Sequence, residues 1–111
     1  MKKSFPVLAS LLLVSCAVKL VTPTQTDADR VQSKFPNYTL AELNQGKVMF
    51  EKHCAECHNL KNPAKFTEKE WQKEVPKMVK KNNKKYPNNI IDTQNQELIL
   101  KYVITMSGHP K

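Results

Sequence analysis

Glycine, aromatic residues and acidic residues are all scarce in this sequence. Only two glycines occur among 111 residues, Gly46 and Gly108, so a fold built from glycine turns between β-strands is not expected. Aromatic residues make up 7% of the chain and nowhere alternate with basic residues, so the net charge of +8 does not indicate a nucleic-acid-binding surface. Abundant Lys, Glu, Leu and Asn favour helices. The sequence predicts one small all-α domain, whose basic surface is either solvated or a docking face for an acidic partner.

No apolar run is long enough to span a membrane comfortably. The longest, Phe5–Val14, follows a positively charged start, which is typical of an export signal over residues 1–15. It ends at Leu13-Val14-Ser15-Cys16, which resembles the bacterial lipoprotein signal. That resemblance implies cleavage before Cys16 and attachment of a diacylglyceryl group to its sulfur. An ordinary secretory signal with an incidental cysteine is the alternative.

Residues 16–38 contain Thr, Gln, Asp and Ser, two prolines and no sustained apolar periodicity. We expect a flexible tether between a lipid on Cys16 and a folded domain over residues 39–111. About twenty flexible residues have a root-mean-square span of roughly 25 Å, so the domain would sample partners above a membrane, facing the periplasm or the extracellular side. The alternative is that part of this segment packs along the domain, through Phe35 and Tyr38 above all.

Cysteine is also rare, but two of the three cysteines stand in Cys54-Ala55-Glu56-Cys57-His58. Two thiols three positions apart can hold a haem by thioether bonds from Cys54 and Cys57, while the following His58 ligates the iron. A thioredoxin-like redox pair requires a βαβ context and a zinc site requires a second pair of ligands, and the sequence offers neither. The motif predicts one covalent haem c, which would supply part of a small core. We expect a carbonyl near Pro63 to accept the second ring N–H of the histidine.

Capping boxes predict where two helices begin. Thr39-Leu40-Ala41-Glu42 predicts a helix that starts at Leu40 and runs into the haem motif. Thr67-Glu68-Lys69-Glu70 predicts a second helix, kinked or restarted at Pro76 because proline removes one helical hydrogen bond. Its apolar stripe consists of Trp71, Val75, Met78 and Val79.

A basic connection and a last helix complete the chain. The run Lys80–Asn89 predicts a solvated loop, or else a basic segment at the edge of the haem that steers an acidic redox partner. Thr93-x-x-Gln96 has the form of a third capping box, so the last helix should begin near Asp92 or Thr93 and end by Gly108.

Two patterns around the haem motif resemble the cytochrome c family. Gly46-x-x-x-Phe50-x-x-x-Cys54-x-x-Cys57-His58 is similar to that family's N-terminal helix and haem-binding turn. The resemblance implies a small domain of three or more helices around the haem, with Gly46 crossed closely by the last helix near Tyr102 and Phe50 beside the haem. The segment Phe66–Met78, with Trp71 inside it, resembles a part of short bacterial cytochrome c domains in which a methionine closes the sixth coordination site.

Three methionines lie in the expected domain. Met49 is only five residues before the first haem cysteine, which leaves too little chain to reach the opposite haem face. Met106 continues an apolar stripe, as a core side chain does. Met78 lies twenty residues beyond His58, enough chain to cross to the distal side. We therefore predict Met78 as the second iron ligand, with Met106 next and His109 or an open site as the remaining alternatives.

These residues predict a lipid-anchored monohaem electron carrier that exchanges single electrons with redox proteins. A six-coordinate iron suits electron transfer, and the sequence has no cluster of catalytic carboxylates, no nucleophile paired with a base and no phosphate-binding loop. One alternative is a haem enzyme or a gas- or peroxide-binding sensor with an open sixth site, in which His53 and His109 would be the polar groups. Another is an electron-transfer subunit of a larger oxidoreductase.

Overall fold

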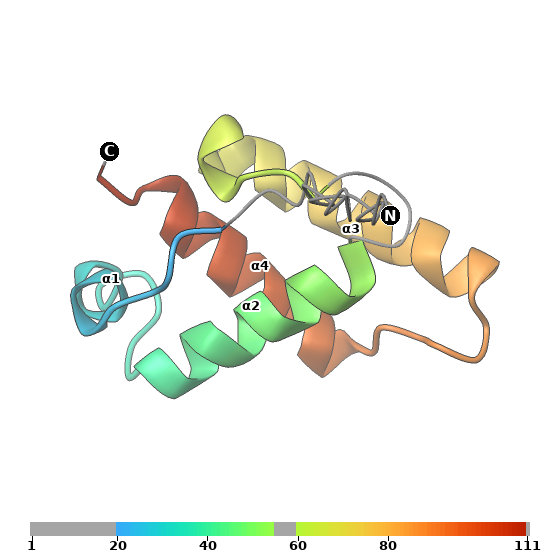
Figure 1. The fold of residues 1–111 in the computed structure, drawn as a ribbon, viewed down its shortest axis with the longest axis horizontal. Coiled ribbons are helices and arrows are strands. Elements are labelled where there is room, and N and C mark those ends of the chain that lie inside the picture. Colours follow the sequence, from blue (N-terminus) through green and yellow to red (C-terminus); the bar gives the residue numbers. More distant parts are fainter. Residues whose placement is uncertain (1–19, 55–59, 111) are drawn as a thin grey trace, which may run out of the picture.

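The computed structural model describes residues 20–54 and 60–110. In these ranges the regular structure is entirely helical, which confirms the all-α prediction (Figure 1). No helix within them has the length and apolar character needed to cross a membrane. The elements are α1 (Gln25–Arg30), α2 (Leu40–Cys54), the short 3₁₀ helix η1 (Pro63–Lys65), α3 (Glu68–Lys85) and α4 (Thr93–Ser107).

The crossing of α2 and α4 organises the domain (Figure 1). Gly46 of α2 meets α4 so closely that a Cβ atom there would lie 2.3 Å from the Leu98 carbonyl oxygen and 2.7 Å from Tyr102 Cβ. Glycine costs about 1 kcal/mol relative to alanine inside a helix, and the close crossing gives this glycine a structural reason. The expected crossing at Gly46 and Tyr102 is confirmed.

The helix starts follow the sequence signals with one difference. The α2 helix begins at Leu40 as predicted, and Thr39 Oγ1 accepts a hydrogen bond from the Glu42 amide at 3.1 Å. Thr67 forms the complete capping box expected for α3. In α4, however, Asp92 is the cap, because its Oδ1 accepts the Asn95 amide at 2.7 Å. The cap of α4 therefore lies one residue before the third capping box predicted at Thr93.

The helix α3 continues through Pro76 to Lys85, so the prediction of a loop from residue 80 is wrong for Lys80–Lys85. Two asparagines near its end explain the extra length. Asn82 donates to the Asn89 carbonyl at 3.0 Å, and Asn83 donates to the Ile91 carbonyl at 3.0 Å while accepting the Ile91 amide at 2.8 Å. These side chains hold the returning chain against α3, which favours a helix over a solvated loop.

Residues 20–38 are folded against the domain, so the prediction of a flexible tether is wrong for this part of residues 16–38. The helix α1 packs beside the start of α2 and the end of α4 (Figure 1). The alternative that Phe35 and Tyr38 pack along the domain is confirmed, because their rings meet edge-on at 5.6 Å and Tyr38 is buried. The remaining tether residues, 16–19, and the expected signal, 1–15, lie outside the described residues. The buried apolar side chains of the folded segment are Leu20, Ala28, Val31 and Tyr38.

A buried carboxylate fastens α1 to the end of α4. Asp27 is 2% exposed, and its Oδ1 lies 2.7 Å from Arg30 Nη2 and 2.6 Å from His109 Nδ1. Its Oδ2 accepts the Thr24 amide at 2.9 Å, and Arg30 also donates to the Thr105 carbonyl at 3.1 Å. Burial alone would raise the pKa of Asp27, but the hydrogen bonds from His109, Thr24 and Arg30 outweigh it and lower the pKa to about 2.

This carboxylate should make the domain sensitive to acid. The ordinary pKa of Asp27 is 3.8 and its folded-state pKa is about 2, so its stabilisation is present above the unfolded-state value of 3.8 and is lost as the pH falls through 2. We expect Asp27→Asn to lower the free energy of unfolding at neutral pH by about 2 kcal/mol and to flatten the pH dependence in that interval. Denaturant unfolding across the interval measures both effects. Asp29→Asn, at the exposed face of α1, is the control, and an equal pH slope in both variants would contradict the assignment.

Candidate haem site

A pocket of about 330 Å³ opens between α2, α3 and α4. The end of α2 supplies Cys54, and one face of α3 supplies Trp71 and Met78. Because α3 continues through Pro76 as one helix, residues on both sides of Pro76 line the same cavity. The other apolar side chains of the lining are Phe50, Phe66, Val75, Val79, Ile91 and Ile99.

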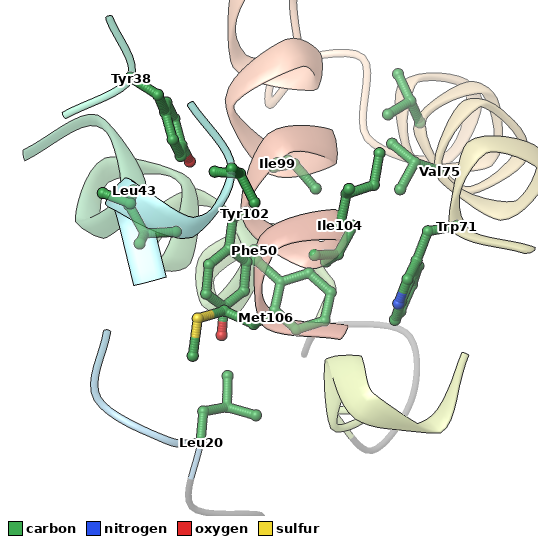
Figure 2. Packing of buried hydrophobic residues seen from close by; sticks show 14 of the residues in the cluster. Leu20, Tyr38, Leu43, Phe50, Trp71, Val75, Ile99, Tyr102, Ile104 and Met106 are labelled. Carbon is green, nitrogen blue, oxygen red and sulfur yellow. The ribbon is translucent and has the colours of Figure 1, made fainter. Parts of the chain in front are cut away.

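Four aromatic rings pack together beside this pocket. The Phe50 ring contacts the Trp71 ring at 6.0 Å and the Tyr102 ring at 5.5 Å between centroids, and it lies between them in Figure 2. Phe66 also meets Trp71 edge-on, with 4.9 Å between ring centroids. Phe50, Trp71 and Tyr102 are each about 1% exposed. The contacts form a rigid apolar wall, because edge-on aromatic packing has a preferred geometry.

The Trp71 indole joins α3 to the turn that follows the haem motif. Its Nε1 donates to the Pro63 carbonyl at 2.8 Å, and the same oxygen accepts the Phe66 amide at 3.3 Å. A carbonyl oxygen has two lone pairs, and Trp71 and Phe66 together donate to both of those of Pro63. His58 lies outside the described residues, so the expectation that a carbonyl near Pro63 accepts its ring N–H stays a prediction.

The methionines occupy three different surroundings. Met78 is half-buried and lines the same pocket as Cys54. Met106 is 4% exposed and lies in the core above Leu20, as Figure 2 shows. Met49 lines a separate groove between α2 and α4. The fold therefore brings Met78, and neither of the others, into the cavity next to the haem motif.

The two histidines considered for open-site chemistry are not brought together. His53 is 4% exposed and lines the pocket beside Cys54. His109 lies at the other side of the domain, where its Nδ1 is 2.6 Å from Asp27 Oδ1. Within the described residues, no acid–base pair of these two groups faces the pocket.

The charged part of the pocket lining is mainly basic. Among the described residues, Lys61, Lys77 and Lys81 line it together with a single carboxylate, Glu74, which lies 3.9 Å from Lys77. Lys61 also lies 5.0 Å from the centre of the Phe66 ring. Sequence reasoning did not assign Lys61 and Lys77 to the site, whereas Lys81 belongs to the basic run that was considered as an edge of the haem. Helical spacing could have pointed to Lys77 and Lys81, because residues 74, 77, 78 and 81 fall on one face of a helix.

Part of the predicted site lies outside the described residues, namely Cys57, His58 and the lipidation candidate Cys16. Within residues 20–54 and 60–110, no group of three or more His, Cys, Asp or Glu side chains is placed to hold a metal ion. Comparison with protein-family models, curated proteins and solved structures finds no match for this chain. The site is therefore interpreted from its own residues, of which Cys54, Phe50, Trp71 and Met78 share one pocket.

Proposed function

We propose that the protein is a monohaem c-type cytochrome, with a cytochrome c-like fold, that carries single electrons between redox proteins. One observation carries the proposal. The first cysteine of the Cys-x-x-Cys-His motif and Met78, twenty residues beyond its histidine, line one apolar pocket. A haem needs such a pocket, a covalent attachment at its edge and ligands from both sides.

Each residue has a defined role in this proposal. Cys54 and Cys57 would attach a haem by thioether bonds, and His58 and Met78 would supply its two iron ligands. A haem bound there would supply reversible one-electron chemistry. Phe50 and Trp71 would pack beside it and exclude water, which together with a thioether ligand favours a relatively high reduction potential.

An electron carrier differs from a haem enzyme or a ligand-binding sensor in that a protein ligand occupies the sixth coordination site of the iron. In favour of the carrier, His109 is engaged by Asp27 and does not line the pocket, which leaves His53 as the only described histidine in the lining. The basic residues Lys61, Lys77 and Lys81 at the pocket fit a redox partner with an acidic docking surface, whose encounter rate they would raise. If that partner is a larger oxidoreductase, the protein would act as its electron-transfer subunit.

Membrane attachment is the second part of the proposal. The sequence Leu13-Val14-Ser15-Cys16 supports cleavage before Cys16 and lipidation of its thiol, which would hold the haem domain on the outer side of a membrane, in the cell envelope. The spare cysteine then has a use that does not compete with haem attachment.

Haem attachment is tested by producing the full chain in bacteria that carry a cytochrome c maturation system. We expect the purified protein to retain one haem after acid and organic extraction, and its oxidised form to show the weak red band that marks methionine–iron ligation in cytochromes c. Cys54→Ala and Cys57→Ala should each lower covalent haem, and the double variant should have none. Cys16→Ser is the matched control, which should keep the haem and lose membrane attachment. Stoichiometric zinc and no haem would refute the proposal.

A further inference from the structure

The folded domain begins very close to the proposed lipid anchor. Leu20 is 7% exposed and packs beneath Met106, near the end of α4 (Figure 2). Only four residue steps separate it from Cys16. We infer that the domain is held directly against the bilayer, with its α1 end facing the lipid, rather than suspended on a long tether. This inference rests on the proposed lipidation of Cys16.

The short chain between Cys16 and Leu20 limits how far the domain can lie from the membrane. Four fully extended residue steps span at most about 14 Å, at roughly 3.5 Å per residue. A lipid-linked sulfur lies near the boundary of the hydrocarbon core, and the headgroup region above it is about 6 Å thick. Leu20 would therefore lie within about 8 Å of the headgroup surface. A tether over the whole of residues 16–38 would have allowed several times that distance.

Residues 20–38 cannot extend without breaking buried interactions. Leu20 and Pro23 are buried, and Asp27 is held by both Arg30 and His109. Arg30 also bonds to the Thr105 carbonyl of α4, so α1 is joined to the C-terminal end of the domain at two points. The short distance from lipid to domain is therefore maintained by the fold itself.

One exposed apolar side chain stands next to Leu20. Val21 is 46% exposed at the point where the described chain begins. The loop between α3 and α4 lies at the opposite end of the domain from α1 (Figure 1). With the α1 end against lipid, that loop and the C-terminal end of α3 face the aqueous side, where a protein partner can reach the pocket residues Lys77 and Lys81.

The orientation is tested with the lipidated, haem-loaded full chain in phospholipid vesicles. Thr22→Cys and Asn88→Cys each introduce one thiol at an exposed position, at the anchor end and in the far loop respectively. Each thiol is labelled with a fluorophore, and its emission is compared with and without a lipid whose headgroup carries a quencher. We expect quenching several-fold stronger at residue 22 than at residue 88. Inserting about twenty Gly and Ser residues between Lys19 and Leu20, a span of roughly 25 Å, should remove most of that difference.

The possible outcomes separate the orientation from the anchor. Equal quenching at residues 22 and 88 in a chain whose Cys16 mass shows the diacylglyceryl group would overturn the orientation and leave the cytochrome and its anchor standing. An insertion that leaves the quenching difference unchanged would overturn the orientation as well. An unmodified Cys16 in the membrane fraction would overturn the anchor and this inference together. The haem absorption spectrum, recorded for every variant, reports separately on the proposed electron carrier.

Discussion

Replacing Met78 with alanine is expected to abolish the red methionine–iron band of the oxidised protein and to lower the reduction potential. Met78 lines the pocket that also contains Cys54, and a thioether ligand stabilises ferrous iron relative to ferric iron. Because axial ligation controls a range of about 0.8 V, a decrease on the order of 0.1 V or more is a reasonable magnitude. Absorption spectroscopy and potentiometric titration measure the two effects. Added imidazole or carbon monoxide should bind the variant far more readily than the native protein.

The matched control is Met106→Ala. Met106 is 4% exposed among core residues, so its truncation should leave the red band and the potential unchanged and lower the free energy of unfolding by about 2–5 kcal/mol. The reverse pattern, with the band lost in Met106→Ala and kept in Met78→Ala, would show that the wrong methionine was chosen. A band kept in both variants would leave neither residue as the ligand.

Local signals predicted most of the helices, because each depends on residues close together in the sequence. Thr67 and Glu70 satisfy two amide groups within three residues, and the predicted start of α3 is correct. Leu40 follows a similar signal at α2. Gly46 was informative for another reason, since an unfavourable helix residue points to a close contact elsewhere.

Contacts between distant residues were not predictable in the same way. Asp27 and His109 are separated by 82 positions, and neither residue indicates the other. Residues 20–38 have the polar composition of a flexible segment, yet part of that polarity, in Asp27 and Arg30, is used internally to hold α1 on the domain. Composition alone cannot distinguish a polar side chain that faces water from one that pairs inside the fold.

The candidate site was predictable where a motif or a helix period fixed it. Trp71 and Met78 were placed on one face of α3 by their seven-residue spacing, and both line the pocket. The sequence favoured Met78 over Met106 by its distance from His58, and the fold adds that Met78 lines the pocket whereas Met106 lies in the core. Lys61 and Lys77 at the pocket were missed, since in the sequence they are two among many basic residues.

Gly46→Ala is expected to destabilise the domain, although it adds a single methyl group. The added Cβ would lie 2.3 Å from the Leu98 carbonyl oxygen and 2.7 Å from Tyr102 Cβ, so α4 has to move away from α2. Alanine gains about 1 kcal/mol in helix propensity, whereas forcing atoms into a well-packed core costs about 1–3 kcal/mol and occasionally more. The nearest atom is a backbone oxygen, which no side-chain rotation can move away. The steric cost should therefore exceed the gain in helix propensity, and the free energy of unfolding should fall by about 2 kcal/mol.

Denaturant unfolding of the haem-loaded protein, followed by helical circular dichroism, measures this loss, and Asn44→Ala provides the comparison. Asn44 is exposed on the same helix, two residues before Gly46, so alanine there should be neutral or stabilise by up to about 0.5 kcal/mol through propensity alone. Gly46→Val should be worse than Gly46→Ala, because a branched side chain adds volume at the same contact. If Gly46→Ala were as stable as Asn44→Ala, α2 and α4 would not cross at this distance. The α4 side chains beside the pocket, Ile99 and Tyr102, would then need a different placement relative to Phe50.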